Sequence, residues 1–569
     1  MEKDNIINID SEEYNTYISS PGMTTAYQEL LLHKNYDRIR IKTPLLTKEY
    51  DKDHNLISVE PFFVDVRLTP PPFDSSLMEE YPLRTGAIVS IIKSSQDITP
   101  TYHINMPEMQ LSFKDLIALK EEYYGFMKTG NTNNIYIKRW YLEFGILEHL
   151  FFDDNVLEIN INPPAYKTPI RIVHSKHQEC KSNIYPSDEL LNYLSTRLKI
   201  STGRPLNRAQ TQLDGEISIE NQRARVAAII EPFSVFGTGF SIRKHREQPW
   251  TLPLFMSNNT VNEWFAGLMS FMITHGRTFL TAGPRGSGKT SLLGSLILEI
   301  LPKYRIITIE DTQELPIKYY RSMGYDILPL KVRSALLQEG LEMPFDTGLR
   351  TSLRLGDSAL IIGEVRSKEA SVLYEAMRIG AMSNTVGGTI HADNPYGVYD
   401  RVVNDLGVPK GSFKATDIII IQKLIKSPTG LGRERRVVSV TEVLKHWDNE
   451  PVFQDLLLYN PNKDALEPTK FLLEGKSETI NNIMANTKGY ETYNDTLNDI
   501  YFRGMAKKSL ISLANGKNDF LEAWYVGRAN TLYANLFETY NPLKSRKNRD
   551  NFFREYNKEL SEILNQGRK

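Results

Sequence analysis

The sequence predicts an α/β protein whose main domain is built on a parallel β-sheet. Between Val261 and about Lys445, short and nearly continuous apolar segments alternate with helical segments. Strands of this kind are typical of parallel sheets that helices cover on both faces. The chain has 569 residues, which is enough for about three to five domains, so further domains are expected around this one. The expected strands of the main domain are Arg277–Ala282, Arg305–Ile309, Ala359–Gly363, Asn384–Ile390 and Asp417–Gln422.

Two regions are expected before this domain. Residues 1–122 form an N-terminal module that is rich in Tyr, Pro and charge. Its three successive prolines, 70–72, fix the backbone and remove hydrogen-bond donors, so this module is expected to be irregular. Residues 123–243 are expected to form an α/β domain with a helix at Asp188–Thr202 that ends at Gly203. The expected strands of this second region are Leu157–Ile161, Ile170–Val173, Glu216–Ile219, Gln222–Ile230 and Gly239–Arg243.

A linker and a C-terminal extension complete the predicted organisation. The hydrophilic stretch Lys244–Trp250, which contains Pro249, predicts a linker over residues 244–256. The main α/β domain then covers residues 257–446. Residues 447–569 are mostly polar with a helical pattern, and they are expected to form a helical extension. Its end carries a basic cluster, which is usually a solvated helix face: Lys544, Arg546, Lys547 and Arg549.

Composition excludes several classes of protein. Lys and Arg total 68 against 69 Asp and Glu, and this balance argues against a polybasic nucleic-acid binder. The single cysteine, Cys180, excludes an internal disulfide framework and a cysteine-based metal cluster. The acidic, polar first residues lack the apolar segment of a secretory signal. The apolar stretch Trp264–Thr274 is shorter than the roughly 18–20 residues that a membrane span needs. A cytoplasmic setting is therefore expected.

The residues from Gly283 to Thr290 match the complete phosphate-loop pattern. An apolar strand, Thr278–Thr281, enters the loop, and an apolar helix, Ser291–Ile300, leaves it. Glycines let backbone N–H groups curl around a phosphate, and the helix N-terminus adds its positive dipole end. Lys289 is expected to reach the β- and γ-phosphates, and the Thr290 hydroxyl is expected to ligate magnesium. The expected nucleotide-binding residues here are Gly283, Pro284, Arg285, Gly286, Ser287, Gly288, Lys289, Thr290 and Ser291.

Two other apolar strands end in carboxylates. One is followed by Glu310 and Asp311, and the other by Glu364. Because the carboxyl ends of parallel strands share one edge of the sheet, Glu310 and Asp311 are expected to face magnesium or the attacking water. Glu364 is expected to polarise that water as a general base.

A histidine and five arginines are further candidates for contact with phosphate. His391 ends the strand that contains Thr389 and Ile390, so a contact with the γ-phosphate is expected there. Arginine stabilises the charge that develops on a transferring phosphoryl group, often from a neighbouring subunit or domain. The candidate arginines are Arg350 and Arg354, one helical turn apart, Arg366 just after Glu364, and Arg225 and Arg243 in the preceding domain.

With these motifs in this order, the chain resembles the type II/IV secretion-system ATPases, the family that drives type II secretion, type IV pili, archaella and type IV conjugation. The resemblance covers the chain from about residue 100 to residue 445. Glu310-Asp311-Thr312, followed by Glu314-Leu315, is most similar to the archaeal branch. The matching segments are the Walker A loop 283–290, the Asp box 308–311, the stretch from Leu349-Arg350 to Leu353-Arg354 that leads into Ile361–Arg366, the His box 388–393, and Gly239–Lys244, which resembles the strand that closes the family's N-terminal domain.

One position departs from the family. Ser383 and Asn384 stand where the His box usually opens with Gly-His, so the role of that first histidine is not carried over to this chain. Asn384 keeps a hydrogen-bond donor at this place. The helical region after about residue 450 has no counterpart in the resemblance.

The resemblance implies a RecA-like P-loop ATPase core that binds ATP and Mg²⁺. It also implies a ring-shaped homo-hexamer in which ATP binds between two lobes and hydrolysis swings them about the linker. In such a ring an arginine from a neighbour completes a site. The implied partner is a polytopic membrane platform protein at the inner face of the cell membrane, where the cytoplasmic ATPase is peripheral and acts indirectly on pilin-like or secreted substrates.

Two other functions remain open at the level of sequence. A nucleic-acid translocase uses the same core, although the near-zero net charge and the missing basic stripe argue against it. A non-catalytic scaffold that binds nucleotide as a switch is opposed by the presence of Lys289, Glu310, Glu364 and His391. DNA-stimulated ATP hydrolysis would favour the first of these functions, and an assembled ring without ATP hydrolysis would favour the second.

Overall fold

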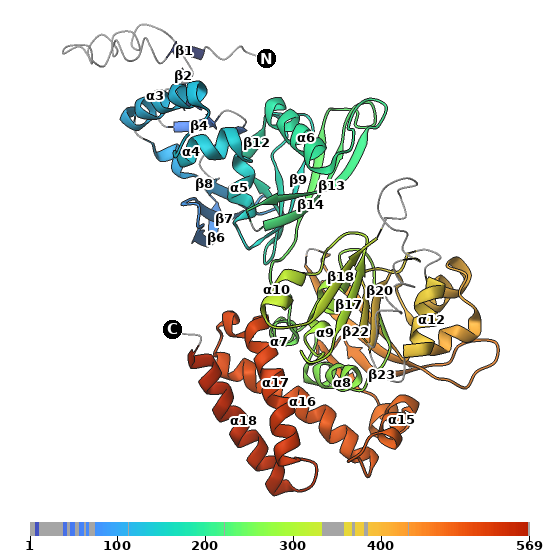
Figure 1. The fold of residues 1–569 in the computed structure, drawn as a ribbon. Helices are drawn as coiled ribbons and strands as arrows, with labels where there is room; N and C mark the ends of the chain where they lie inside the picture. The colour runs from blue at the N-terminus through green and yellow to red at the C-terminus, as the bar shows by residue number, and fades with distance from the viewer. Residues whose placement is uncertain are drawn as a thin grey trace. The chain divides into compact units, whose positions relative to one another are not determined.

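The computed structural model describes residues 6–10, 38–42, 46–51, 56–61, 64–67, 74–111, 113–220, 222–332, 347, 358–366, 370–380, 385–430 and 432–566. The chain forms two compact units, Met1–Glu247 and Gln248–Lys569, which we call the N-terminal unit and the C-terminal unit (Figure 1). Among the described residues, no helix combines the length and the apolar character that crossing a bilayer requires.

The N-terminal unit is centred on a nine-stranded, mostly antiparallel sheet in the order β13-β14-β15-β9-β10-β11-β8-β7-β6. The strands expected between residues 157 and 243 are all present in it. Strands β6–β8 lie inside the stretch that was expected to be irregular, and β8 pairs with β11. The bounds are β6 Ser75–Pro82, β7 Ile88–Ser94, β8 Thr101–Asn105, β9 Val156–Ile161, β10 Arg171–His174, β11 Gln178–Ser182, β13 Gln212–Ile219, β14 Gln222–Ile229 and β15 Gly239–Lys244.

A second sheet and several helices complete this unit. The sheet has the order β1-β2-β3-β4-β5-β12. Helix α6, Asp188–Thr202, begins where Ser187 Oγ accepts the Leu190 N–H and ends at Gly203 in the left-handed conformation, as the sequence predicted. The other elements are β1 Ile6–Asp10, β2 Arg38–Lys42, β3 Leu46–Asp51, β4 Leu56–Pro61, β5 Val64–Arg67, β12 Ile184–Pro186, η1 Pro107–Gln110, α3 Phe113–Thr129, α4 Ile135–Ile137, η2 Lys138–Leu142 and α5 Ile146–Phe151.

The C-terminal unit is built on one nine-stranded sheet in the order β18-β17-β19-β20-β16-β21-β22-β23-β24. The strands from β18 to β21 are parallel, and the three that follow are antiparallel. This confirms the parallel sheet expected from the apolar segments. The bounds are β16 Phe279–Ala282, β17 Ile306–Glu310, β18 Ile327–Lys331, β19 Ala359–Ile362, β20 Val386–Ile390, β21 Ile418–Lys426, β22 Arg433–Val443, β23 Phe453–Asn460 and β24 Ala465–Pro468.

Both faces of this sheet are buried. Phe279 of β16 packs into one apolar cluster with α8 and α9, and the next residue, Leu280, packs into a cluster with α12 and η4 on the other face. Successive strand residues point to opposite faces, which explains the continuous apolar runs in the sequence. The helical elements around the sheet are α7 Leu252–Ser257, α8 Glu263–Thr274, α9 Lys289–Ile297, α10 Ile317–Ser322, α12 Ala370–Gly380, α13 Pro395–Asp400, η3 Arg401–Asp405 and η4 Lys410–Ala415.

Helices between Lys470 and Gln566 pack on this core (Figure 1, orange and red). Their apolar cluster includes Phe502, Leu532, Phe552 and Leu560, and Leu254 of α7 belongs to the same cluster. The part of the extension from Lys470 onward is helical, as the sequence predicted, whereas β23 and β24 lie within residues 447–469, which were expected to be helical and instead continue the sheet. Its elements are α14 Lys470–Leu473, α15 Glu478–Asn486, α16 Tyr493–Ala514, η5 Asn518–Leu521, α17 Ala523–Tyr540 and α18 Arg546–Gln566.

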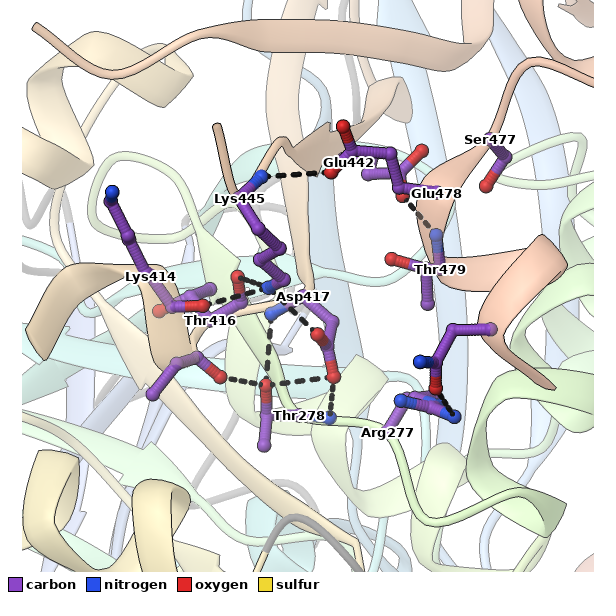
Figure 2. Close-up of polar contacts among 12 residues, drawn as sticks. Arg277, Thr278, Lys414, Thr416, Asp417, Glu442, Lys445, Ser477, Glu478 and Thr479 are labelled. Atoms are coloured by element: carbon purple, nitrogen blue, oxygen red, sulfur yellow. Dashed lines mark hydrogen bonds and ion pairs between the residues drawn. The ribbon is translucent and has the colours of Figure 1, made fainter. Parts of the chain in front are cut away.

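A buried polar network holds the amino-terminal end of β16 (Figure 2). The N–H and the hydroxyl of Thr278 both donate to Asp417 Oδ2, at 3.1 and 3.3 Å. Lys445 Nζ lies 2.8 Å from the other oxygen of Asp417. The Lys445 N–H donates to Glu478 at the start of α15, at 2.9 Å. The C-terminal extension is thus joined to the base of the central strand by charge-assisted hydrogen bonds.

Candidate active site

The phosphate loop runs from the end of β16 to the start of α9. Gly286 and Gly288 have φ angles of 80° and 97°, in the left-handed region that glycine adopts without strain. Gly288 is the N-cap of α9, so the loop ends on free N–H groups at a helix N-terminus. Arg285 and Gly286 are exposed, whereas the Ser287 side chain is buried. This is a cradle of backbone N–H groups, which suits a bound phosphate.

Lys289 lies across this loop. Its Nζ donates to the Pro284 carbonyl at 3.0 Å and lies 3.5 Å from Nδ1 of His391. Burial lowers the pKa of Lys289, and the charge of Glu364 partly offsets this. Pro284 at the start of the loop and His391 after β20 thus hold the ammonium group of Lys289 at the loop.

The other predicted side chains come from neighbouring strand ends at the same edge of the sheet. Glu310 ends β17, Glu364 follows β19, and His391 follows β20. These strands are parallel to one another and to β16, so their carboxyl ends meet beside the phosphate loop. The structure therefore brings the three motifs together, as the sequence predicted.

A continuous array of contacts joins five of these residues, and we call it the acid–base array: Lys289, His391, Glu364, Arg366 and Asp311. His391 Nε2 lies 3.1 Å from Glu364 Oε1. Arg366 donates from Nη2 to Glu364 Oε2 and from Nη1 to Asp311 Oδ2, the latter at 3.2 Å. The guanidinium of Arg366 thus lies between the carboxylates of Glu364 and Asp311, and these opposite charges stabilise one another.

The array fixes the protonation states of its members. Burial raises the pKa of Glu364, but the hydrogen bond and the charge of Arg366, together with the charge of Lys289, outweigh it, so this pKa lies below its usual range. Burial and the charge of Lys289 lower the pKa of His391. Glu364 is therefore ionised at neutral pH and His391 is neutral. Because Lys289 has no acceptor, Nδ1 of His391 faces it with its lone pair, and Nε2–H donates to Glu364.

Glu310 is bound differently from Glu364. Its Oε1 accepts the N–H groups of Glu314 and Leu315 at 3.0 and 3.1 Å, so one carboxylate oxygen holds the turn after β17. Its side chain passes over Gly363, where an added Cβ would lie 2.9 Å from Glu310 Cγ. The glycine before Glu364 is therefore needed to bring the two acidic strand ends together.

Some predicted residues lie elsewhere. Arg225 and Arg243 belong to the N-terminal unit, where they are direct partners on β14 and β15 and so share one face of the sheet. Arg243 also pairs with Glu158 at 2.7 Å. Arg350, Arg354 and Asn384 lie outside the described residues. Thr290 and Ser291 are half-buried in the first turn of α9.

Two residues at the phosphate loop were missed by the sequence reasoning. Arg435 of β22 donates from Nε to the Gly286 carbonyl at 3.1 Å. Gln422 of β21 is fully buried beside Gly283 and Gly288. Neither lies in a recognisable motif. The only sequence signal was a polar residue at the end of the apolar run Ile418–Ile421.

The comparisons with known proteins match the part of the chain that contains this site. The family model described as type II/IV secretion system protein matches residues 158–452, more than half of the chain. A Mycobacterium tuberculosis protein, provisionally named a conjugal transfer protein, is 28% identical over 255 residues, which cover 44% of this chain and 69% of the relative. The uncharacterised protein MJ0900 of Methanocaldococcus jannaschii is 26% identical over 383 residues, 66% of each chain. The Legionella pneumophila ATPase DotB, solved by X-ray crystallography, is 17% identical, covers 64% of this chain with 94% of its own, and gives a TM-score of 0.39.

Proposed function

The chain belongs to the type II/IV secretion system protein family, and from this premise we propose that it is a motor ATPase that powers secretion or filament assembly through a type II or type IV pilus-like machine. The observation that carries the proposal is the acid–base array beside the phosphate loop. A loop that only binds nucleotide needs no ionised carboxylate at this place. A hydrolase does, because water must lose a proton as it attacks.

The phosphate loop and Lys289 supply the binding of ATP. The left-handed Gly286 and Gly288 turn the loop around the phosphates, and Lys289 neutralises part of their charge. Binding of the γ-phosphate would draw the Lys289 ammonium away from the Pro284 carbonyl. The nucleotide then replaces a neutral partner by an anionic one, which is the stronger interaction.

Glu364 is the proposed general base. Its lowered pKa keeps it ionised, as a base requires. It takes the proton of a water whose oxygen attacks the γ-phosphorus, and the bond from that phosphorus to the bridging oxygen breaks to give ADP and phosphate. His391 and Arg366 each contact one oxygen of Glu364. We infer that these two donors move toward the γ-phosphate and so release the base.

The residues at this edge also fit Mg²⁺, which would neutralise charge on the phosphates. Thr290 offers a hydroxyl, and Glu310 and Asp311 offer carboxylate oxygens, which are the ligand types that Mg²⁺ prefers. No group of three or more acidic, His or Cys side chains that could hold a metal is found in the described part of the chain.

The assembly and the setting follow from the family and complete the proposal. We propose a homo-hexamer that is cytoplasmic and peripheral at the inner face of the cell membrane, with a polytopic platform protein as its partner. In such a ring Arg225 and Arg243 are the proposed arginines that reach a nucleotide from the N-terminal lobe, and Arg350 and Arg354 are further candidates. Arg225 and Arg243 share one face of their sheet, so they could engage one ligand together.

The test of the chemistry is a pair of variants in the full chain. Lys289→Ala should abolish ADP binding in calorimetry, because the loop loses its fixed charge. Glu364→Gln should bind ATP but release phosphate at least 10²-fold more slowly, because the shape stays and the base is lost. Glu474→Gln is the matched control: this carboxylate is exposed and pairs with Lys476, so its turnover should equal that of the wild type. Normal hydrolysis by Glu364→Gln would move the base to another residue.

The test of the biological role is affinity capture of ATP-loaded Glu364→Gln from gently solubilised native membranes, followed by mass spectrometry. A polytopic membrane protein with small pilin-like subunits is the expected result. DNA-processing proteins without a membrane partner would instead support the nucleic-acid translocase.

A further inference from the structure

Gln422 lies directly under the phosphate loop. Strand β21 runs parallel to β16, with Ile421 opposite Ala282, so Gln422 is level with Gly283 at the start of the loop. A Cβ added to Gly283 would lie 2.2 Å from the Gln422 carbonyl oxygen, and one added to Gly288 would lie 3.1 Å from Gln422 Nε2. One side chain and its backbone thus contact both ends of the loop.

The amide of Gln422 is buried without a hydrogen bond. The residue is fully buried, and neither Nε2 nor Oε1 has a partner among the described residues. Ser287 Oγ, in the loop itself, is in the same state there. A buried amide that loses its water without gaining a partner is costly, and Leu or Met would fill the same space without that cost. A buried amide without a partner beside a phosphate loop indicates a functional state in which the amide forms a hydrogen bond.

The geometry of a phosphate loop provides such a state. Within each peptide unit the N–H and C=O groups point in roughly opposite directions, because the unit is planar and trans. A loop that turns its N–H groups toward a phosphate therefore turns carbonyl oxygens away from it. Gln422 lies on the protein side of the loop, and its Nε2 is the atom that approaches Gly288. This N–H₂ group is a donor for those carbonyls.

We propose that Gln422 is a positioning residue whose amide becomes hydrogen-bonded to the phosphate loop only when a nucleoside diphosphate or triphosphate binds and sets the conformation of that loop. The proposal rests on the proposed function, since it concerns the same nucleotide. The buried amide on β21 is then unfavourable until nucleotide binds, and binding gives that amide a hydrogen-bond partner. Affinity for nucleotide is therefore coupled to a side chain that does not touch the ligand.

The coupling predicts that Gln422→Leu keeps or raises the melting temperature and lowers the affinity for Mg-ADP. Without nucleotide the variant should unfold at the same or a higher temperature than the wild type, because an unsatisfied amide has been removed. Its affinity for Mg-ADP should be about tenfold weaker, which corresponds to about 1.4 kcal/mol, because the bound loop no longer gains a hydrogen bond. A side chain that only packs would lower the melting temperature and leave the affinity unchanged.

The experiment measures thermal unfolding and calorimetric Mg-ADP binding of the full chain. Thr441→Val is the matched control on the neighbouring strand: Thr441 is buried and donates to Asp455 at 2.6 Å, so this variant should be less stable and should bind ADP normally. Gln422→Met, which is unbranched like Gln, is the second variant in case Leu does not fit. If both Gln422 variants unfold or are destabilised, the amide is already satisfied in the empty protein and the inference is wrong.

The two proposals fail separately. A wild-type chain that does not bind ADP would overturn the proposed function. A wild-type chain that binds ADP and loses it in Lys289→Ala, while Gln422→Leu binds with wild-type affinity, would overturn only the role of Gln422.

Discussion

Replacement of Gly504 by Ala should push helix α16 of the C-terminal extension away from helix α8 of the core and so lower the stability of the C-terminal unit. Helices α8 and α16 cross with glycine on both sides. A Cβ on Gly504 would lie 2.2 Å from the Glu263 carbonyl oxygen, and one on Gly267 would lie 2.0 Å from the Ile500 carbonyl oxygen. Backbone atoms cannot rotate away as the end of a side chain can, so the helices must move apart. Helix α8 leads into β16, so this crossing also supports the strand that carries the phosphate loop.

The size of the effect follows from the overlap. Contact distances between heavy atoms are about 3.5 Å, so the helices must separate by roughly 1 Å, and the apolar contacts beside the glycines lose much of their dispersion energy. Overpacking of this kind typically costs about 1–3 kcal/mol, while Ala gains about 1 kcal/mol over Gly within a helix. A backbone clash belongs at the upper end of that range, so we expect a net loss of about 2 kcal/mol. For a unit of this size, the melting temperature should fall by roughly 3 °C.

Circular dichroism during heating, together with limited proteolysis of the full chain, measures this effect. Gly504→Ala should melt earlier and expose cleavage sites in α16–α18. Gly411→Ala is the control, because nothing lies within 4 Å of its added Cβ and its backbone is not left-handed. Equal melting temperatures for Gly504→Ala and the wild type would show that the helices do not cross as closely as the structure has them.

Two further predictions concern pH. Arg366→Ala should shift the acid limb of the kcat/KM profile, which reports the protein before nucleotide binds, to higher pH, because the hydrogen bond from Arg366 lowers the pKa of Glu364. An unmoved limb in kcat/KM would exclude Glu364 as the base. Burial lowers the pKa of His174 to about 4, so this side chain is neutral when folded and binds a proton near its ordinary pKa of 6.5 only when unfolded. The N-terminal unit should therefore lose about 2 kcal/mol from this residue between pH 7.5 and pH 5, and His174→Gln should reduce that loss in urea denaturation curves.

The sequence was sufficient for the parts of the fold that depend on short-range patterns. The phosphate loop, the acidic strand ends and His391 were predicted because motif and strand occur together within a few residues, and parallel strands then meet at one edge. Helix α6 was predicted to the residue because Ser187 and Gly203 are strong caps. The family expected from these motifs is confirmed, and the archaeal relative agrees with the archaeal branch.

Contacts between distant segments could not be predicted in this way. Strands β23 and β24 continue the sheet beyond residue 446, but nothing in their local pattern indicates which edge they join. The role of Arg366 as a link between Asp311 and Glu364 depends on the pairing of β17 with β19. The predicted actions of the site residues, the arginines that act in trans and the domain boundaries remain predictions.

The two ends of β16 differ in how they are held, and this difference suggests where nucleotide acts. At its amino end the strand is fixed by Asp417, which also pairs with Lys445 and so with the C-terminal extension. At its carboxyl end, Gln422 and Ser287 are buried without hydrogen bonds among the described residues. A buried polar group without a partner is costly, so a ligand that provides one gains free energy at the carboxyl end of the strand and not at the amino end. If the proposed function is right, the extension serves as a fixed base and the phosphate loop is the element that nucleotide reshapes.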